Sequence, residues 1–421
     1  MGSITPRDYQ LDMANSIVNG FKTLKHPFAA VASTAAGKSV VIAEVCHQLD
    51  EPVLILQPSK EILLQNYAKL KAYGYDDISM YSASVGQKII SRFTFATIGS
   101  IRKKPELFKH FKYCIIDECH QVAPKNISGM YMTFFRETGI EKICGLTATP
   151  FRLENKYVRN DDGSMCYTGV TQMLNRITRK PFFREFVYKI EMEDLIDRGF
   201  LLEPNYHTYD VDMSDLVVNT TGRDYTDESL EKWGDKKLKN LVSVAETVQA
   251  KHKRVLVFCS SLRQCGRAIE LLKAMNVHAE VLDGKTPKKQ REGIIERFRD
   301  GRLKWVVNVG TMTTGFDCPP LDAIVLLRPT MSVALYVQMV GRGVRIDPAD
   351  PFKTSHIYDF SGSHEKFGPA QKIRVGKEDG YKDMLYGERG RIDNVALFSF
   401  DVKNDKFKKK EITLADIMAK I

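Results

Sequence analysis

Short apolar runs alternate with segments of helical spacing in two separate blocks of the chain. In the first block, runs rich in β-branched and aromatic residues predict five strands, at residues 28–33, 53–57, 93–97, 113–117 and 143–147. Residues 37–49 have the spacing of a helix between the first two strands. Nearly continuous apolar strands bounded by helices are typical of a parallel sheet covered on both faces, so we expect an α/β domain here.

The second block repeats this pattern. Its apolar runs predict strands at residues 255–259, 279–283, 304–308, 322–327 and 355–360. We therefore expect two tandem α/β domains, each with a doubly wound parallel sheet flanked by helices. The alternation weakens after Phe360, and Thr413 is placed to cap a short amphipathic helix near the end of the chain.

Two polar segments interrupt the pattern. Residues 154–165 are polar and rich in turn-forming residues, which predicts an exposed insertion. Residues 210–234 are also polar, and we expect them to form a loop or linker.

Length and composition agree with two globular domains. The chain has 421 residues, of which 43% are hydrophobic and 27% charged. Its net charge of +10 favours a polyanionic partner. The eight cysteines form no C-x-x-C pair, so we expect no zinc site and a reducing compartment. We see no apolar run of membrane-spanning length and no signal peptide, so we expect a soluble, cytoplasmic protein.

Residues 32–39, ASTAAGKS, follow a predicted strand and open a predicted helix. The ending G-K-S is typical of a P-loop, in which backbone N–H groups and a helix N-terminus hold phosphates. In such a loop Lys38 reaches the β- and γ-phosphate oxygens and Ser39 binds Mg²⁺. Ala32 stands where the strict pattern has its first glycine, so from this stretch alone a chance G-K-S is an open alternative.

An acidic pair in residues 114–120, CIIDECH, changes that picture. Asp117 ends an apolar strand, where its carboxylate can face Mg²⁺ bound near Ser39. Glu118 is placed to orient and deprotonate an attacking water. The alternative is a solvated acidic strand end, which the P-loop upstream disfavours.

With these motifs in order, the chain resembles the superfamily-2 helicases of the DExH type over roughly residues 6–365. The resemblance implies two tandem RecA-like domains, at residues 1–188 and 189–365, with a nucleotide cleft between them and a C-terminal extension at 366–421. It also implies ATP and Mg²⁺ as cofactors and nucleic acid as a partner.

Further motifs carry this resemblance. PRDYQ resembles the adenine-recognition motif, with Gln10 reading the base and Arg7 nearby. LTATPFR resembles the motif that couples the acidic pair to domain closure, and VGTMTTGFD resembles the second domain's coupling motif. The implied nucleotide-binding residues are Ala35, Ala36, Gly37, Lys38, Ser39, Gly315 and Asp317. The implied coupling residues are Thr147, Thr149 and His120, for which a structural hydrogen bond is the alternative.

Hydroxyl groups and one lysine at strand ends resemble the family's motifs that grip the sugar–phosphate backbone. Such contacts are largely independent of base sequence. For each residue alone, a helix cap or turn is an equal alternative. The candidates are Ser59, Lys60, Thr97, Ser100, Ser260, Thr311 and Thr314.

QMVGRGVR, residues 338–345, resembles the arginine-finger motif. We expect Arg342 and Arg345 to lie on one face of a helix, three residues apart, with His120 coupled to Gln338. Two neighbouring cations without a local carboxylate repel each other unless an anion arrives, which suits a γ-phosphate. Gly341 and Gly343 are expected to let this helix approach the cleft. The alternative is a solvated basic helix face.

MTTGFD, LLRPTMSVALYVQMVGRGVR and YDFSGSHEKFGP make the chain similar to the RadD group of bacterial DNA-repair ATPases. That group has a cysteine-rich, zinc-binding C-terminal region, whereas this chain has no cysteine after Cys318. Phage relatives that resemble branch-migration helicases are a second placement. Together these likenesses imply a monomeric DNA helicase or translocase for repair, recombination or replication, acting on single-stranded or branched DNA in a bacterial or phage-infected cell. An RNA helicase and a motor that remodels protein–DNA complexes without strand separation are open alternatives.

Overall fold

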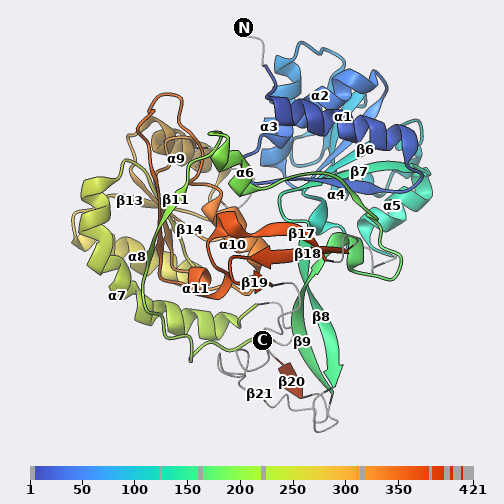
Figure 1. The fold of residues 1–421 in the computed structure, drawn as a ribbon. Helices are drawn as coiled ribbons and strands as arrows, with labels where there is room; N and C mark the ends of the chain where they lie inside the picture. The colour runs from blue at the N-terminus through green and yellow to red at the C-terminus, as the bar shows by residue number, and fades with distance from the viewer. Residues whose placement is uncertain are drawn as a thin grey trace. The chain divides into compact units, whose positions relative to one another are not determined.

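A computed structural model of the chain describes residues 5–123, 126, 128–159, 165–219, 224–310, 312, 318–378, 382–392, 399–401 and 409–410. The chain divides into two compact units. The first comprises Met1–Phe151 with Met173–Asp194, and the second comprises Arg152–Gln172 with Leu195–Ile421. Each unit is built around its own parallel sheet (Figure 1), which confirms the predicted α/β class.

The sheet of the first unit has eight strands in the order β10-β1-β7-β6-β2-β5-β3-β4. All neighbours pair in parallel except β4, which is antiparallel to β3. Every residue of β1, β2 and β6 is buried, which is why continuous apolar runs predicted them. The bounds are β1 (Phe28–Ala32), β2 (Val53–Gln57), β3 (Ile78–Ser82), β4 (Gln87–Lys88), β5 (Phe93–Thr97), β6 (Tyr113–Asp117), β7 (Lys142–Thr147) and β10 (Phe186–Ile190).

Helices follow most strands of the first unit, and α2 confirms the helix predicted after the first strand. The predicted boundary between residues 188 and 189 falls inside β10, which pairs with β1. The bounds are α1 (Asp8–Thr23), α2 (Lys38–Leu49), α3 (Lys60–Ala72), α4 (Ile98–Ile101), α5 (Met130–Thr138) and α6 (Met192–Asp197), with short 3₁₀ turns η1 (Pro105–Phe108), η2 (Cys119–Gln121) and η3 (Leu174–Arg176).

The sheet of the second unit has six parallel strands in the order β11-β16-β15-β12-β14-β13. Five of them are the predicted strands of the second block, and β11 is added at one edge. The bounds are β11 (Pro204–Thr208), β12 (Val255–Phe258), β13 (Ala279–Leu282), β14 (Trp305–Asn308), β15 (Ala323–Leu326) and β16 (Ser355–Asp359).

Two helices, α7 (Asp227–Lys251) and α8 (Leu262–Ala274), pack side by side on one face of this sheet. Leu241 and Val248 of α7 share a buried cluster with Val257 of β12 and Val325 of β15. The other helices are α9 (Lys288–Asp300), α10 (Val333–Val340), α11 (Ser363–Phe367) and the 3₁₀ turn η4 (Ala370–Lys372).

Smaller sheets complete the second unit. An antiparallel sheet follows the last parallel strand where the sequence showed no pattern, and it consists of β17 (Arg374–Glu378), β18 (Lys382–Gly387) and β19 (Gly390–Arg391). A second sheet has the order β21-β20-β9-β8, with β8 (Phe151–Arg159), β9 (Met165–Met173), β20 (Ser399–Asp401) and β21 (Lys409–Lys410). The helix predicted near Thr413 lies outside the described residues.

Two polar segments differ from their prediction. The expected insertion at 154–165 contains the end of β8, and Glu154 is buried there. The expected loop at 210–234 contains the first two turns of α7, because Thr226 caps the helix through the N–H of Ser229 and Trp233 is fully buried. Within the described residues, no helix is long and apolar enough to cross a membrane.

Candidate ATP site and arginine segment

The predicted P-loop connects the buried strand β1 to α2. Ala35 and Gly37 both have left-handed backbones, with φ of +70° and +77°, and Gly37 caps α2. Turns of this kind direct backbone N–H groups into an anion-binding concavity at a helix N-terminus. Ala32, which replaces the first glycine of the strict motif, lies inside β1 and is 1% exposed. Position 32 therefore belongs to the strand, and the left-handed residues of the turn are Ala35 and Gly37.

Residues of the adenine-recognition motif hold this loop from the side. The hydroxyl of Tyr9 and the amide Nε2 of Gln10 both donate to the carbonyl of Ala36, at 2.9 and 3.0 Å. Gln10 Oε1 accepts from the N–H of Arg7 at 2.9 Å. A Cβ atom on Gly37 would lie 2.5 Å from Gln10 Nε2, so this contact requires glycine. The second N–H of Nε2 donates to the hydroxyl of Tyr9 at 3.5 Å, so Oε1, which can accept two hydrogen bonds, is the end that keeps a position for a base.

The two predicted magnesium ligands are linked by a residue that the motifs did not reveal. Asn66 on α3 donates to Asp117 Oδ2 at 2.9 Å and accepts a hydrogen bond from the hydroxyl of Ser39. Asn66 is 3% exposed and lies on the helix face formed by Ile62, Leu63 and Leu70. A polar residue at an apolar position of the helical period was the signal that could have identified it.

Asp117 ends β6 and is 4% exposed. Burial and the neighbouring Glu118 carboxylate raise its pKa to about 6, against the opposing effects of Lys38 and the hydrogen bond from Asn66. A buried carboxylate close to a serine hydroxyl has the oxygen ligands that Mg²⁺ prefers, and water and phosphate usually supply the others. Ser39 and Asp117 therefore fit the predicted ion. The described residues contain no group of three or more His, Cys, Asp or Glu side chains that could hold a metal.

Glu118 follows in an unusual backbone conformation, with φ of +49°. A non-glycine residue in the left-handed region is strained, and such strain is concentrated at functional sites. Its side chain is 12% exposed, with Oε1 3.9 Å from Lys38 Nζ and Oε2 3.4 Å from His120 Nδ1. The predicted base thus stands between the P-loop lysine and the histidine.

The predicted coupling residues form one hydrogen-bonded group. His120 Nδ1 lies 2.9 Å from the hydroxyl of Thr147 and 3.3 Å from that of Thr149. The N–H of Thr149 donates to Thr147 Oγ1 at 3.0 Å. A movement of residues 147–149 would therefore reach Glu118 through His120.

Several predicted nucleic-acid ligands have local partners in the fold. Ser59 caps α3, accepting from the N–H of Ile62, and Lys60 opens that helix. Thr97 and Ser100 share a hydrogen bond of 2.9 Å at the end of β5. Ser260 donates to Gln264 Oε1 at 2.8 Å. The remaining candidates Thr311 and Thr314, and the predicted nucleotide ligands Gly315 and Asp317, lie outside the described residues.

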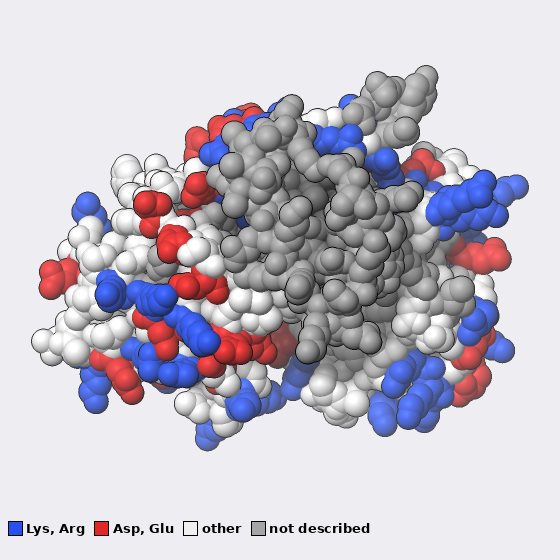
Figure 2. Space-filling model, turned by 90° about the horizontal axis from the view of Figure 1, so that it is seen from below, with Lys and Arg blue, Asp and Glu red and all other residues white. Residues whose placement is uncertain are grey.

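Charge alone marks no single nucleic-acid surface on the face drawn in Figure 2. In the described part of that face, lysine and arginine side chains lie in small groups among acidic ones. The net charge of +10 is therefore not gathered there into one basic area.

In the second unit, the predicted helix through Arg342 and Arg345 is wrong. The helix α10 ends at Val340, and residues 341–345, which we name the arginine segment, form a turn followed by an extended bridge. Two glycines disfavour a helix here, and the carbonyl of Val344 accepts instead from the N–H of Leu202 at 2.7 Å. Arg342 is 7% exposed, and Gln338 on α10 is 8% exposed.

Comparisons with known proteins agree with these two units. The family described as "Type III restriction enzyme, res subunit" matches residues 3–152, and the "Helicase conserved C-terminal domain" matches residues 235–347. The first match contains all strands of the first parallel sheet except β10, and the second contains all strands of the second parallel sheet except β11 and β16. These matches support a superfamily-2 helicase, as the sequence motifs implied.

Curated relatives of this chain are distant. IRC3 of Saccharomyces cerevisiae, which is named as an ATP-dependent helicase, is 24% identical over 85% of this chain and 51% of its own length. The "DNA 3'-5' translocase XPB2" of Sulfurisphaera tokodaii is 22% identical over 80% of this chain and 78% of its own length. The chain spans about half the length of IRC3 and 61% of a matching Lactococcus phage protein.

Solved structures share the fold. A fragment assigned as the HsdR subunit of a type I restriction enzyme from Vibrio vulnificus superimposes with a TM-score of 0.63 at 20% identity, covering 86% of this chain and 65% of its own. A single-residue variant of S. cerevisiae Dbp5 bound to RNA and ADP BeF3 superimposes with a TM-score of 0.57 at 13% identity, covering 87% of this chain and 88% of its own. The RecA-like character of both units, which the resemblance implied, is confirmed.

Proposed function

We propose that this chain is a nucleic-acid-stimulated ATPase that works as a DNA helicase or translocase. The observation that carries the proposal is the arrangement at the carboxyl edge of the first sheet. There Lys38 Nζ lies 3.9 Å from Glu118 Oε1, and Asn66 links Ser39 to Asp117. Ligands of parallel α/β sheets bind at this edge, beyond the ends of the strands.

Each residue has a separate part in the proposed reaction. The N-terminus of α2 and Lys38 bind the ATP phosphates. Ser39 and Asp117 would hold Mg²⁺, which would supply positive charge to the phosphates of bound ATP. Glu118 accepts a proton from water as the water oxygen bonds to the γ-phosphorus. The bond from that phosphorus to the β–γ bridging oxygen breaks, and ADP leaves with its electron pair.

Stimulation by nucleic acid requires a structural connection between the residues that bind the nucleic-acid strand and those that hydrolyse ATP. The group formed by His120, Thr147 and Thr149 supports such a connection, because His120 lies 3.4 Å from the Glu118 carboxylate. Arg342 and Arg345 are proposed as the cations of the second unit that stabilise the charge of the transition state, and Gln338 as their link to His120. ATP turnover would then alternate the grip of the two units on one strand.

DNA is the favoured partner. XPB2 is named as a DNA translocase, and the V. vulnificus fragment comes from a restriction enzyme. We place the activity in repair, recombination or replication, on single-stranded or branched DNA, with the chain acting as a cytoplasmic monomer. The fold is shared with Dbp5 bound to RNA, so RNA is the competing partner to be tested.

The decisive experiment compares steady-state ATP hydrolysis with RNA, single-stranded DNA, duplex DNA, forks and four-way junctions, with strand displacement measured on the forks and junctions. We expect stimulation by DNA and displacement of a strand. Stimulation by RNA alone would overturn the DNA assignment. If DNA stimulates hydrolysis but no strand is displaced, the protein would be a motor that moves along DNA or remodels protein–DNA complexes, not a helicase. The Lys38→Ala variant, which lacks the phosphate-binding ammonium, is the negative control.

A further inference from the structure

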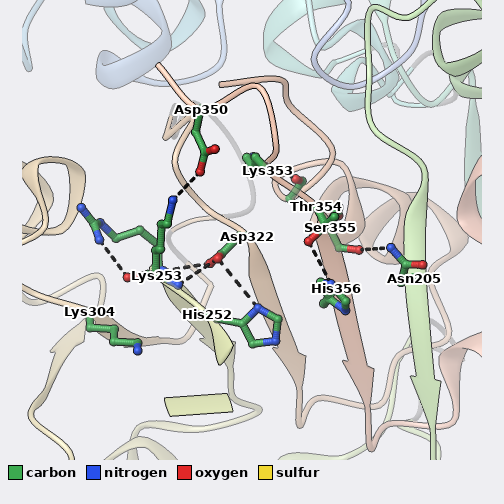
Figure 3. Close-up of polar contacts among 12 residues, drawn as sticks. Asn205, His252, Lys253, Lys304, Asp322, Asp350, Lys353, Thr354, Ser355 and His356 are labelled. Atoms are coloured by element: carbon green, nitrogen blue, oxygen red, sulfur yellow. Dashed lines mark hydrogen bonds and ion pairs between the residues drawn. The ribbon is translucent and has the colours of Figure 1, made fainter. Parts of the chain in front are cut away.

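A buried lysine lies beside the arginine segment. Lys353 occupies the loop before β16 and is 8% exposed (Figure 3). Its Nζ donates to the carbonyls of Pro319 and Arg345 at 2.5 Å each, and to that of Gly343 at 3.3 Å. An ammonium group has three N–H donors, so these three carbonyls use all of them.

The carboxylates of Asp322 and Asp350, near Lys353, bind other groups. Asp322 accepts from the backbone N–H groups of Lys253 and Arg254, at 2.8 Å each. Asp350 pairs with the exposed ammonium of Lys253 at 2.5 Å (Figure 3). The charge of Lys353 is therefore held chiefly by backbone carbonyls, although the burial of a charge is costly.

Burial is the largest influence on the ionisation of Lys353, and it lowers the pKa to about 8. The charged or titratable groups that act on it are Asp322, Asp347 and Cys318, which raise the pKa, and Arg345, which lowers it. At mildly alkaline pH the ammonium therefore loses one proton, and with it one of its three donors.

The carbonyls that Lys353 holds belong to the backbone that carries the two arginines. Successive carbonyls of residues 343, 344 and 345 accept from Lys353, from the N–H of Leu202, and again from Lys353. Gly343 also packs closely on the sheet, where an added Cβ would lie 3.1 Å from Ile324 Cδ1 and 3.2 Å from Ser355 Oγ. The backbone of the arginine segment is therefore fixed on both sides.

We propose that Lys353 is a positioning residue for ATP hydrolysis, which sets the backbone of the arginine segment and ties it to Pro319. Pro319 follows the segment that contains the predicted nucleotide ligand Asp317, so one ammonium joins two motifs of the second unit. This inference rests on the proposed ATPase function. It assigns to Lys353 an effect on turnover that acts through the arginines, without contact to the nucleotide.

The test uses Lys353→Met, which keeps the length of the side chain and removes the donors. We expect kcat of DNA-stimulated hydrolysis to fall at least about tenfold, because a displacement of about 1 Å in a catalytic group can cost about 10²-fold. The affinity for a fluorescent ATP analogue should change less than threefold, since the P-loop belongs to the other unit. The matched control is Lys253→Met, which removes the ion pair between an exposed lysine and Asp350 of the loop that carries Lys353.

A pH profile separates positioning from mere stability. In the wild-type protein kcat should fall as the pH rises through about 8, because the amine loses a donor. Deprotonation also removes a buried charge from the folded state. The free energy of unfolding should therefore rise as the pH rises above about 8, while kcat falls. Lys353→Arg keeps a cation that does not titrate there, so its kcat should stay level between pH 7 and 9.

The outcomes distinguish the two proposals. A wild-type protein without DNA-stimulated hydrolysis overturns the proposed function itself. If the wild-type protein is active, two results would overturn only the role of Lys353. One is a kcat of Lys353→Met within twofold of the wild-type value, and the other is an alkaline limb of Lys353→Met that matches the wild-type limb. The role of Lys353 is also overturned if the melting temperature and kcat of Lys353→Met and Lys253→Met fall in parallel.

Discussion

Asn66 Nδ2 lies 2.9 Å from Asp117 Oδ2, and the carbonyl end of the same amide accepts the hydroxyl of Ser39. One neutral side chain is therefore hydrogen-bonded to both proposed magnesium ligands, which belong to different elements. It also stabilises the charged form of a carboxylate whose pKa burial raises to about 6.

Asn66→Ala should shift the acid limb of hydrolysis. In the wild type, activity should be lost as the pH falls through about 6, because protonated Asp117 is a poor metal ligand. A hydrogen bond to a charged group contributes about 1.5–3 kcal/mol, so its loss should move this limb upward by about one to two pH units. The pH dependence of kcat/KM measures the shift. Lys69→Ala, on the exposed side of the same helix, should leave the limb in place, and an unmoved limb in Asn66→Ala would contradict the role of Asn66.

Glu118→Gln tests the assignment of the base. The amide cannot take the proton of the attacking water, so we expect turnover to fall by about 10²–10⁴-fold. Binding of ATP should persist, since Lys38 and the turn at Gly37 are unchanged. Equilibrium binding of a fluorescent analogue and single-turnover hydrolysis measure the two effects. Near-normal hydrolysis would refute the assignment, and Glu61→Gln, an exposed change on α3, should behave as the wild type.

Arg342→Ala should reduce hydrolysis by at least about 10²-fold while changing the affinity for ATP much less, since arginine fingers act mainly on the transition state. Separate measurements of kcat and of nucleotide affinity check this split. Arg302→Ala, whose side chain is 60% exposed, is the control. A large loss of affinity at unchanged turnover would assign Arg342 to the ground state instead.

Gly343→Ala should disturb the same segment by steric means. A Cβ atom would lie 3.1 Å from Ile324 Cδ1, so the backbone or the sheet must yield. We expect a loss of about 1–3 kcal/mol in the free energy of unfolding, as for other overpacked sites, together with reduced kcat. Gly266→Ala on α8 meets open space and should be neutral or slightly stabilising by contrast. Urea titrations compare the two variants, and equal stability would contradict the close packing of Gly343.

Much of the fold could be predicted because its strands are buried on both faces, so that runs such as residues 53–57 and 113–117 stand out in the sequence. The start of α7 was missed because its capping and first-turn residues, Thr226, Asp227 and Glu228, are polar like a loop. The motifs of the ATP site could be predicted, because short local spacing encodes them.

Residues that complete the sites from other elements were harder to predict. Asn66 contacts Ser39 and Asp117 across 27 and 51 positions of the sequence. Lys353 binds backbone carbonyls, which leave no trace in residue identity. The turn at residues 341–345 escaped prediction because contacts with Leu202 and Lys353, not local preference alone, end the helix at Val340.

The most direct test of the central claim is the rate of ATP hydrolysis by the purified chain with and without single-stranded DNA, at two salt concentrations. We predict a DNA-stimulated rate that Lys38→Ala abolishes, and an apparent DNA affinity that weakens at higher salt, because contacts to the phosphate backbone release counterions. A rate that is the same with and without DNA, and with and without Lys38, would contradict the account.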